Sequence, residues 1–302
     1  MNTPEPVPAV ATAVPADLAA FAATAVGSCT LVADLSWPYE GSEVYRIRDA
    51  HGVDHILKRL INDRFYGMEV AGYRWAPALG PGRAPILEAA DRALRAVIVS
   101  FLPGAPMLGE IEPVLEARAY RQAGRLLALL HSAEPPAAET ALLERLLDRA
   151  EQQLAKAAAE LDAGQRTLAR RAAQLLAEAA PGLRGVPTHG DIQPRNLLLD
   201  RVSGTLALID FEKAGIAPPV RDLVRLEAGI FTGRPQLRDA FYDGYGRELD
   251  PVETLALRAW VVLDSVSALA WGIPNGDHEI VARARAALTD ARFTDLEPDP
   301  PR

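Results

Sequence analysis

The strongest constraint on the fold is a change of pattern near residues 103–104. Short apolar runs separated by turns fill residues 30–102, whereas long stretches with helical spacing of apolar residues fill most of 113–290. A period of two favours strands and a period of 3.6 favours helices. The chain is therefore expected to be α+β, with a β-rich part at 1–102 and a larger, mostly helical part at 103–302. A crevice between two such parts is a common place for a ligand.

The pattern also predicts individual elements. In the first part we expect a short helix at 16–27, a three-stranded meander within 30–60, a helix at 64–79 and a hairpin at 85–102. In the second part we expect a short hairpin at 197–209 and helices at 113–132, 140–162, 164–180, 219–230, 235–246, 251–272 and 277–290. Both ends, 1–15 and 294–302, are rich in proline and are expected to be loose.

Composition excludes several classes of protein. The net charge of −8 leaves no basic excess to neutralise phosphates, which argues against a general nucleic-acid binder. A single cysteine, Cys29, cannot form an intrachain disulfide, so a reducing cytoplasm fits best. The N-terminus lacks the basic segment of a secretory signal, and Asp264 interrupts the longest apolar run. We expect a cytoplasmic monomer or homodimer with neither a membrane nor a nucleic acid as partner.

Polar residues lie on both sides of the hairpin at 197–209. Asp191 and Asn196 precede it, and Asp210 follows it directly. Because a hairpin returns the chain beside its starting point, Asn196 and Asp210 are expected to face the same small volume, with Asp191 on the adjoining loop. Oxygen ligands of this kind suit Mg²⁺, which also uses substrate phosphates. A loop carboxylate beside such a site can orient a hydroxyl proton, so the pattern favours phosphoryl transfer.

This order of residues resembles the protein-kinase set of a catalytic-loop Asp, an Asn five residues later and an Asp after the next hairpin. With Gly190 after His189, and Glu212 two residues after the last Asp, the chain is similar to the aminoglycoside phosphotransferase and choline kinase-like family. The resemblance implies a two-lobed protein-kinase-like fold. It implies a nucleotide-binding lobe at 1–102 and a catalytic, substrate-binding lobe at 103–302.

The resemblance also assigns roles to residues of the catalytic segment. It implies that Asp191 is the catalytic residue and that Asn196 and Asp210 bind Mg²⁺. ATP or GTP is then the phosphoryl donor, and a small molecule with a hydroxyl group is the acceptor. Two features differ from a protein kinase. Gly190 stands where the catalytic-loop arginine would be, and the segment between Asp210 and Asp222 leaves little room for a long phosphorylatable loop.

A phosphate anchor is expected in the first part. The chain contains 29 arginines and only three lysines, and Lys58 is the only lysine before residue 156. A compact ammonium contacts phosphate oxygens as a point charge, a role that arginine fills poorly. The resemblance implies that Lys58 contacts the α- and β-phosphates and that Glu69 pairs with it, although Asp63 and Glu88 remain alternative partners.

Two further segments complete the expected nucleotide site. Gly41 and Ser42 lie in the turn between the first two strands, where their backbone N–H groups would contact phosphate; a plain β-turn is the alternative. Ser100 and Leu102 fit the family's interlobe hinge, whose backbone would bond the base; a buried edge strand is the alternative.

Several polar residues of the second part are left with open roles. Asp222 matches a family position that supports the catalytic loop, and Glu212 is expected to face solvent rather than reach a metal. Gln193 and Arg195 either contact phosphate or steady the loop. Glu227 and Asp264 either contact an amine of the acceptor or lie on helix faces.

The sequence therefore favours a small-molecule kinase. An antibiotic O-phosphotransferase conferring resistance is the first interpretation. A metabolite kinase of the amino-alcohol, sugar or homoserine type is the alternative, and a nucleotide-binding pseudokinase or scaffold is a weaker one, because all the chemical positions are filled.

Overall fold

The chain forms two compact units. The computed structural model describes residues 13–37, 42–134 and 151–297. Unit 1 comprises Met1–Gly104 together with Ala207–Ala214, and unit 2 comprises Ala105–Leu206 and Gly215–Arg302. The sequence-based division assigned 207–214 to the C-terminal part, whereas these residues pack with the N-terminal ones. Most of the N-terminal segment expected to be loose, residues 1–12, lies outside the described residues.

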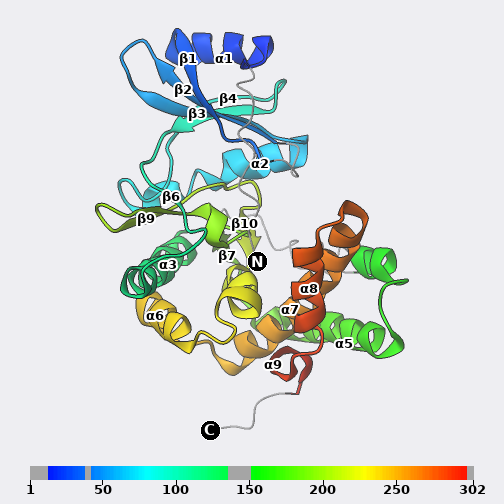
Figure 1. Ribbon diagram of the computed structural model, residues 1–302. Helices are drawn as coiled ribbons and strands as arrows, with labels where there is room; N and C mark the ends of the chain where they lie inside the picture. The colour runs from blue at the N-terminus through cyan, green and yellow to red at the C-terminus, as the bar shows by residue number, and fades with distance from the viewer. Residues whose placement is uncertain (1–12, 38–41, 135–150, 298–302) are drawn as a thin grey trace. The chain divides into compact units, whose positions relative to one another are not determined.

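Unit 1 is built on a five-stranded antiparallel sheet of order β1-β2-β3-β5-β4 (Figure 1). The strands are β1 (Cys29–Asp34), β2 (Glu43–Asp49), β3 (Asp54–Arg59), β4 (Leu87–Asp91) and β5 (Ala96–Ser100). Helix α1 (Ala16–Val26) buries Leu18 and Ala22 in a core that includes Leu57 of β3. Since side chains alternate along a strand, Lys58 lies on the opposite face from Leu57. The expected first helix, meander and hairpin are confirmed.

The helix expected at 64–79 is shorter than predicted. Helix α2 spans Asp63–Gly72, and a separate 3₁₀ turn, η1, covers Ala76–Leu79. Pro77 starts the second turn, and a proline cannot continue a preceding helix because it lacks the N–H donor. Gly72 packs so closely on the chain after Asp210 that an added Cβ would lie 2.7 Å from the Cβ atoms of both Phe211 and Ala214.

Unit 2 is mostly helical. Its helices are α3 (Pro113–Ser132), α5 (Ala163–Ala179), α6 (Pro235–Tyr245), α7 (Pro251–Asn275), α8 (His278–Ala287) and α9 (Ala291–Thr294). Helices α3 and α6 pack backbone to backbone, because a Cβ at Gly124 would collide with the carbonyl oxygen of Phe241 and one at Gly244 with that of Arg121. Residues 151–157 are also helical, while the start of the helix expected at 140–162 lies outside the described residues.

Short strands and turns hold the loops of unit 2. Strand β7 (Val186–Thr188) pairs with β10 (Gly215–Ala217), and β6 (Ala105–Pro106) pairs with β8 (Leu197–Asp200). Strand β9 (Thr205–Leu208) completes the expected hairpin with β8. The expectation of a single helix at 219–230 is wrong. A 3₁₀ turn, η4 (Pro219–Asp222), comes first, and a π-helix, η5 (Leu226–Ile230), follows it. Such π-helical turns are frequent at functional sites.

Two expectations about the C-terminal region need correction. Asp264 does not interrupt the apolar run: it lies within α7, which among the described residues is the one helix long and apolar enough to cross a membrane. Yet 61% of its most apolar stretch is buried in the protein, as in a core helix. The tail from residue 294 is not wholly loose, since Leu296 is only 6% exposed. Residues 298–302 lie outside the described residues.

Candidate functional site

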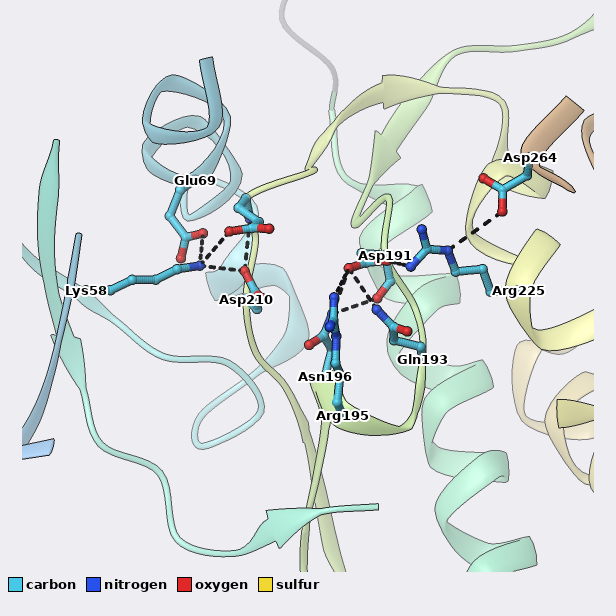
Figure 2. Close-up of polar contacts among 10 residues, drawn as sticks. Lys58, Glu69, Asp191, Gln193, Arg195, Asn196, Asp210, Arg225 and Asp264 are labelled. Atoms are coloured by element: carbon cyan, nitrogen blue, oxygen red, sulfur yellow. Dashed lines mark hydrogen bonds and ion pairs between the residues drawn. The ribbon is translucent and has the colours of Figure 1, made fainter. Parts of the chain in front are cut away.

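In unit 1, three carboxylates surround the ammonium group of Lys58. Its Nζ lies 3.1 Å from Glu69 Oε2 and 2.7 Å from Asp210 Oδ1 (Figure 2). It also lies 3.2 Å from Glu212 Oε2. Lys58, Glu69 and Glu212 are all buried. The ion pair of Lys58 with Glu69 that the resemblance implied is present. The exposed position expected for Glu212 is wrong, because this side chain turns inward to Lys58.

Local structure holds each of these groups in place. Strand β3 presents Lys58, and α2 presents Glu69, whose Oε1 accepts a hydrogen bond of 2.8 Å from the Tyr73 hydroxyl. The Tyr73 ring in turn packs on Phe211, with ring centroids 5.2 Å apart. Asp210 has a φ of +71°, a left-handed conformation that is uncommon outside glycine. Backbone conformations of this kind are concentrated at functional sites.

The electrostatics of this cluster are dominated by burial. Burial raises the pKa of Glu69 to about 7, since the attraction of Lys58 only partly offsets it. Burial also raises the pKa of Glu212, and Asp210 adds to the effect. Burial opposes the charged form of Lys58, but Asp210, Glu69 and Glu212 together raise its pKa well above the ordinary value. Lys58 is therefore charged, and the carboxylates outnumber it by three to one.

In unit 2, the carboxylate of Asp191 is held by several donors. Its Oδ2 accepts hydrogen bonds from Gln193 Nε2 at 3.0 Å, Asn196 Nδ2 at 3.3 Å and Arg195 Nη2 at 3.4 Å. Its Oδ1 forms an ion pair with Arg225 Nη1 (Figure 2). Asp191 is 1% exposed, so these contacts compensate for the loss of its hydration. They fix the orientation of the carboxylate.

Asn196 is oriented by the same loop. Its Nδ2 also donates to the carbonyl oxygen of Asp191 at 2.9 Å, so the amide nitrogen is used within the loop. The side-chain Oδ1 accepts no hydrogen bond from the residues that the structure describes. Asn196 can therefore offer an oxygen ligand. Gln193 and Arg195, whose roles the sequence left open, both steady Asp191.

Asp222 supports the loop that carries Asp191. Its carboxylate accepts hydrogen bonds from the backbone N–H groups of His189 at 2.9 Å and Gly190 at 2.6 Å. Gly190 has a φ of +78°, a conformation that glycine adopts readily. His131 Nε2 lies 3.1 Å from Asp222 Oδ2, and its Nδ1 lies 2.9 Å from the Tyr245 hydroxyl. Burial opposes the charged form of Asp222, but the contacts with His131 and His189 lower its pKa.

Sequence reasoning missed Arg225, which contacts Asp191 from the turn before η5. A basic residue within the apolar run at 223–226 was the available signal. Arg225 Nε also lies 3.9 Å from Asp264 Oδ2, so Figure 2 shows it between the two carboxylates.

The other expected nucleotide contacts all lie in unit 1. Gly41 lies outside the described residues, and Ser42 is half-buried just before β2. The N–H of Ser100 donates to the Ile86 carbonyl at 2.9 Å, so it is already used. Leu102 follows β5, and its backbone forms no hydrogen bond within the described part of the chain. Leu102 can therefore offer its backbone to a ligand. The closeness of Asn196 and Asp210 stays a prediction.

A family model described as the phosphotransferase enzyme family matches residues 42–258, which is more than half of the chain. This chain belongs to the phosphotransferase enzyme family. The match covers Lys58, Glu69, Asp191, Asn196 and Asp210. The chain is thus an enzyme, as the sequence predicted, and its chemistry is phosphoryl transfer to a small molecule. No curated protein sequence matches this phosphotransferase significantly.

Solved structures show the fold of this phosphotransferase. A macrolide 2'-phosphotransferase from Brachybacterium faecium is 18% identical, with a TM-score of 0.58 over 90% of this chain and 97% of that one. A choline/ethanolamine kinase family protein from Mesorhizobium loti is 20% identical, with a TM-score of 0.62 over 92% and 95%.

A thermostable mutant of aminoglycoside phosphotransferase APH(4)-Ia, in ternary complex with AMP-PNP and hygromycin B, is 15% identical. Its TM-score is 0.67, over 93% of this chain and 99% of that one. The α+β, protein-kinase-like fold expected from the sequence is confirmed.

Proposed function

We propose that this phosphotransferase moves the γ-phosphoryl group of ATP or GTP to a hydroxyl group of a small molecule. The observation that carries the proposal is the buried Lys58, in contact with Glu69 and Asp210. A strand lysine held between carboxylates from a helix and from the chain after a hairpin is the arrangement that protein kinases use at the nucleotide phosphates. Lys58 contacts the α- and β-phosphates in this proposal, and Glu69 fixes its position.

The residues present fit a bound Mg²⁺. Asn196 offers a carbonyl oxygen whose amide nitrogen is already engaged, and Asp210 offers a carboxylate from a fixed left-handed backbone. Hard oxygen ligands of this type, few in number, suit Mg²⁺, which fills its remaining positions with water and substrate phosphates. When bound, the ion neutralises charge that develops on the transferred phosphoryl group. Asn196 and Asp210 are therefore the proposed metal ligands.

Asp191 is the proposed catalytic residue. Its carboxylate is fixed by Gln193, Asn196 and Arg225, so an acceptor hydroxyl can donate its hydrogen to one of the two carboxylate oxygens. This contact aims the hydroxyl oxygen at the γ-phosphorus and receives the proton as the new P–O bond forms, while the bond from the γ-phosphorus to the β-phosphate oxygen breaks and ADP or GDP leaves. Such transition states require little covalent help, so positioning and charge supply most of the rate.

Two acceptor classes remain within the proposal. An antibiotic is favoured by the likeness to a macrolide phosphotransferase and to a phosphotransferase bound to hygromycin B. A metabolite is favoured by the likeness to the choline/ethanolamine kinase family protein. In either case we expect a cytoplasmic enzyme that acts as a monomer or homodimer, with Ser42 and Leu102 contributing backbone contacts to the nucleotide.

The substitution Asp191→Asn tests the proposal. It keeps the shape of the side chain but removes the proton acceptor, so transfer should fall by about 10²–10⁴-fold. Binding of Mg²⁺–nucleotide should change little, as measured by calorimetry. Asp200→Asn is the matched control, since Asp200 caps the turn at Val202 and Ser203 in the same unit. Near-normal turnover of the Asp191→Asn enzyme would show that the assigned role is wrong.

A thermal-shift titration separates this enzyme from a pseudokinase or scaffold. Mg²⁺–ATP or Mg²⁺–GTP should raise the melting temperature, because a ligand that binds only the folded state stabilises it. No response to either nucleotide would favour the scaffold. A coupled assay of ADP or GDP release over a panel of hydroxylated antibiotics and metabolites then identifies the acceptor.

A further inference from the structure

Three arginines of unit 2 gather around Asp191 and Asp264. Arg195 and Arg225 both contact the Asp191 carboxylate. Arg221 Nη1 lies 3.8 Å from Asp264 Oδ1, and Arg225 Nε lies 3.9 Å from Asp264 Oδ2. Figure 2 shows Arg225 between the two carboxylates. The cluster thus combines three basic groups with two acidic ones.

Two neighbouring carboxylates of unit 2, those of Glu227 and Asp222, are engaged by other groups. Glu227 is buried, and its Oε1 accepts hydrogen bonds from Arg238 Nε at 3.0 Å and the Tyr242 hydroxyl at 2.9 Å. The side chain of Asp222 is fully buried and faces His131 and the loop N–H groups. The sequence offered two residues as amine contacts. Of these, Glu227 is already bound by Arg238 and Tyr242, and Asp264 is flanked by two arginines.

Arg221 has unused hydrogen-bonding capacity. Its guanidinium carries five N–H donors, and its distance of 3.8 Å from Asp264 exceeds that of a hydrogen bond. The Arg221 side chain forms no other hydrogen bond or ion pair with the described residues. The side chain is nevertheless only 21% exposed, and that of Arg225 is 27% exposed. Donors that are partly withdrawn from water favour an anionic ligand with a planar pair of oxygens.

We infer that the acceptor carries an anionic group, best a carboxylate, which Arg221 and Arg225 bind while Asp191 orients the hydroxyl. The inference rests on the proposed function and narrows its acceptor class. An incoming carboxylate competes with Asp191 for Arg225, and so releases Asp191 Oδ1 for the hydroxyl. A cationic acceptor such as an aminoglycoside would meet arginines where it needs carboxylates. Hydroxy acids, rather than amino alcohols, are the matching substrates.

A charge-matched acceptor series tests this inference. Hydroxy acids, the corresponding hydroxy amides and amino alcohols on the same carbon skeletons are assayed by release of ADP or GDP, and hydroxy-acid binding is measured by calorimetry without nucleotide. Hydroxy acids should exceed their amides by about tenfold or more in kcat/KM, since a hydrogen bond between two charged groups is stronger than one to a neutral amide. Amino alcohols should be the poorest acceptors.

Variants assign the preference to the two arginines. Arg221→Gln and Arg225→Gln should weaken hydroxy-acid binding and raise its KM about tenfold, with a much smaller change for the amide. Arg225→Lys, which keeps the charge, should lose less than Arg225→Gln. Arg171→Gln is the control, because Arg171 is an exposed arginine of α5 whose one ion pair within the described residues is with Glu178. It should behave as the wild type.

Three results would overturn the inference. The first is an equal or higher kcat/KM for the amide or the amino alcohol. The second is a KM for the hydroxy acid that neither glutamine variant changes. The third is an equal loss of Mg²⁺–ATP affinity in both variants without acceptor, which would assign the arginines to the γ-phosphate of the donor. A preference for the neutral or cationic compounds refutes the inference alone, whereas no transfer to any compound refutes the proposed function as well.

Discussion

The contact of Gly72 with the chain after Asp210 leads to a quantitative prediction. In Gly72→Ala, the new Cβ would lie 2.7 Å from the Cβ atoms of Phe211 and Ala214 and 3.2 Å from Phe211 Cδ1. Carbon atoms prefer separations of about 3.5–4.0 Å, so the two closest pairs must open by about 1 Å. Both contacted Cβ atoms are fixed to the backbone, and no rotamer change can relieve the clash. Either α2 or residues 211–214 must shift.

The expected loss of stability follows from two opposing contributions. Overpacking of this kind costs about 1–3 kcal/mol. Replacing glycine by alanine in a helix contributes about 0.5–1 kcal/mol in the opposite direction. The net loss should be between about zero and about 2.5 kcal/mol in the free energy of unfolding, centred near about 1 kcal/mol. Because Phe211 directly follows Asp210, the shift should also displace the Asp210 carboxylate from Lys58 and weaken nucleotide binding.

Gly67→Ala is the matched control on the same helix, because a Cβ at Gly67 would meet nothing within 4 Å. This variant should be more stable than the wild type by about 0.5–1 kcal/mol. Denaturant titrations measure both free energies of unfolding. Hydrogen exchange of peptides from α2 and 207–214 shows whether the change lies there. A Gly72→Ala protein as stable as Gly67→Ala, with unchanged nucleotide affinity, would refute the reasoning.

Two further predictions concern buried carboxylates. The folded protein holds a proton on Glu69 up to about pH 7, whereas the unfolded chain releases it near pH 4.5. As the pH rises from about 4.5 to 7, the wild type should therefore lose stability relative to Glu69→Gln. Denaturant titrations at both ends of this range measure the difference, and a pH-independent difference would contradict it. Asp222→Asn replaces one carboxylate oxygen by an NH2 donor, so one backbone N–H, of His189 or Gly190, loses its acceptor, which should cost about 1–3 kcal/mol in the same titration. Unchanged stability and unchanged transfer would show that Asp222 does not support the loop.

Local patterns predicted much of unit 1. The meander, α1 and the hairpin of β4 and β5 follow from alternating apolar residues and clear turn signals. The scarcity of lysine singled out Lys58 without any structure. The end of α2 could not be predicted, because it depends on the packing of Gly72 against residues far along the chain. The burial of Glu212 also depends on tertiary structure, since its partner Lys58 lies more than 150 residues earlier.

The candidate site was only partly predictable for the same reason. The spacing of Asp191, Asn196 and Asp210 around one hairpin is a local signal, and it indicated phosphoryl transfer. Arg225 lies 34 residues from Asp191, and no spacing rule connects them. The choice between an amine contact and a helix-face position for Asp264 likewise depended on its neighbours. The proposed acceptor class depends on these two residues and on Arg221, so the sequence could indicate the reaction but not the acceptor.

The membership of residues 207–214 in unit 1 has a consequence for biosynthesis. About 100 residues separate Gly104 from this segment, and the ribosome must complete them before unit 1 has all its parts. Until then, Tyr73 lacks the Phe211 ring, and Lys58 has one of its three carboxylate partners. A nascent chain or truncated fragment that stops near residue 104 therefore lacks part of unit 1, the segment 207–214. Unit 1 can complete its folding only after residues 105–206 of unit 2 and then residues 207–214 have been synthesised.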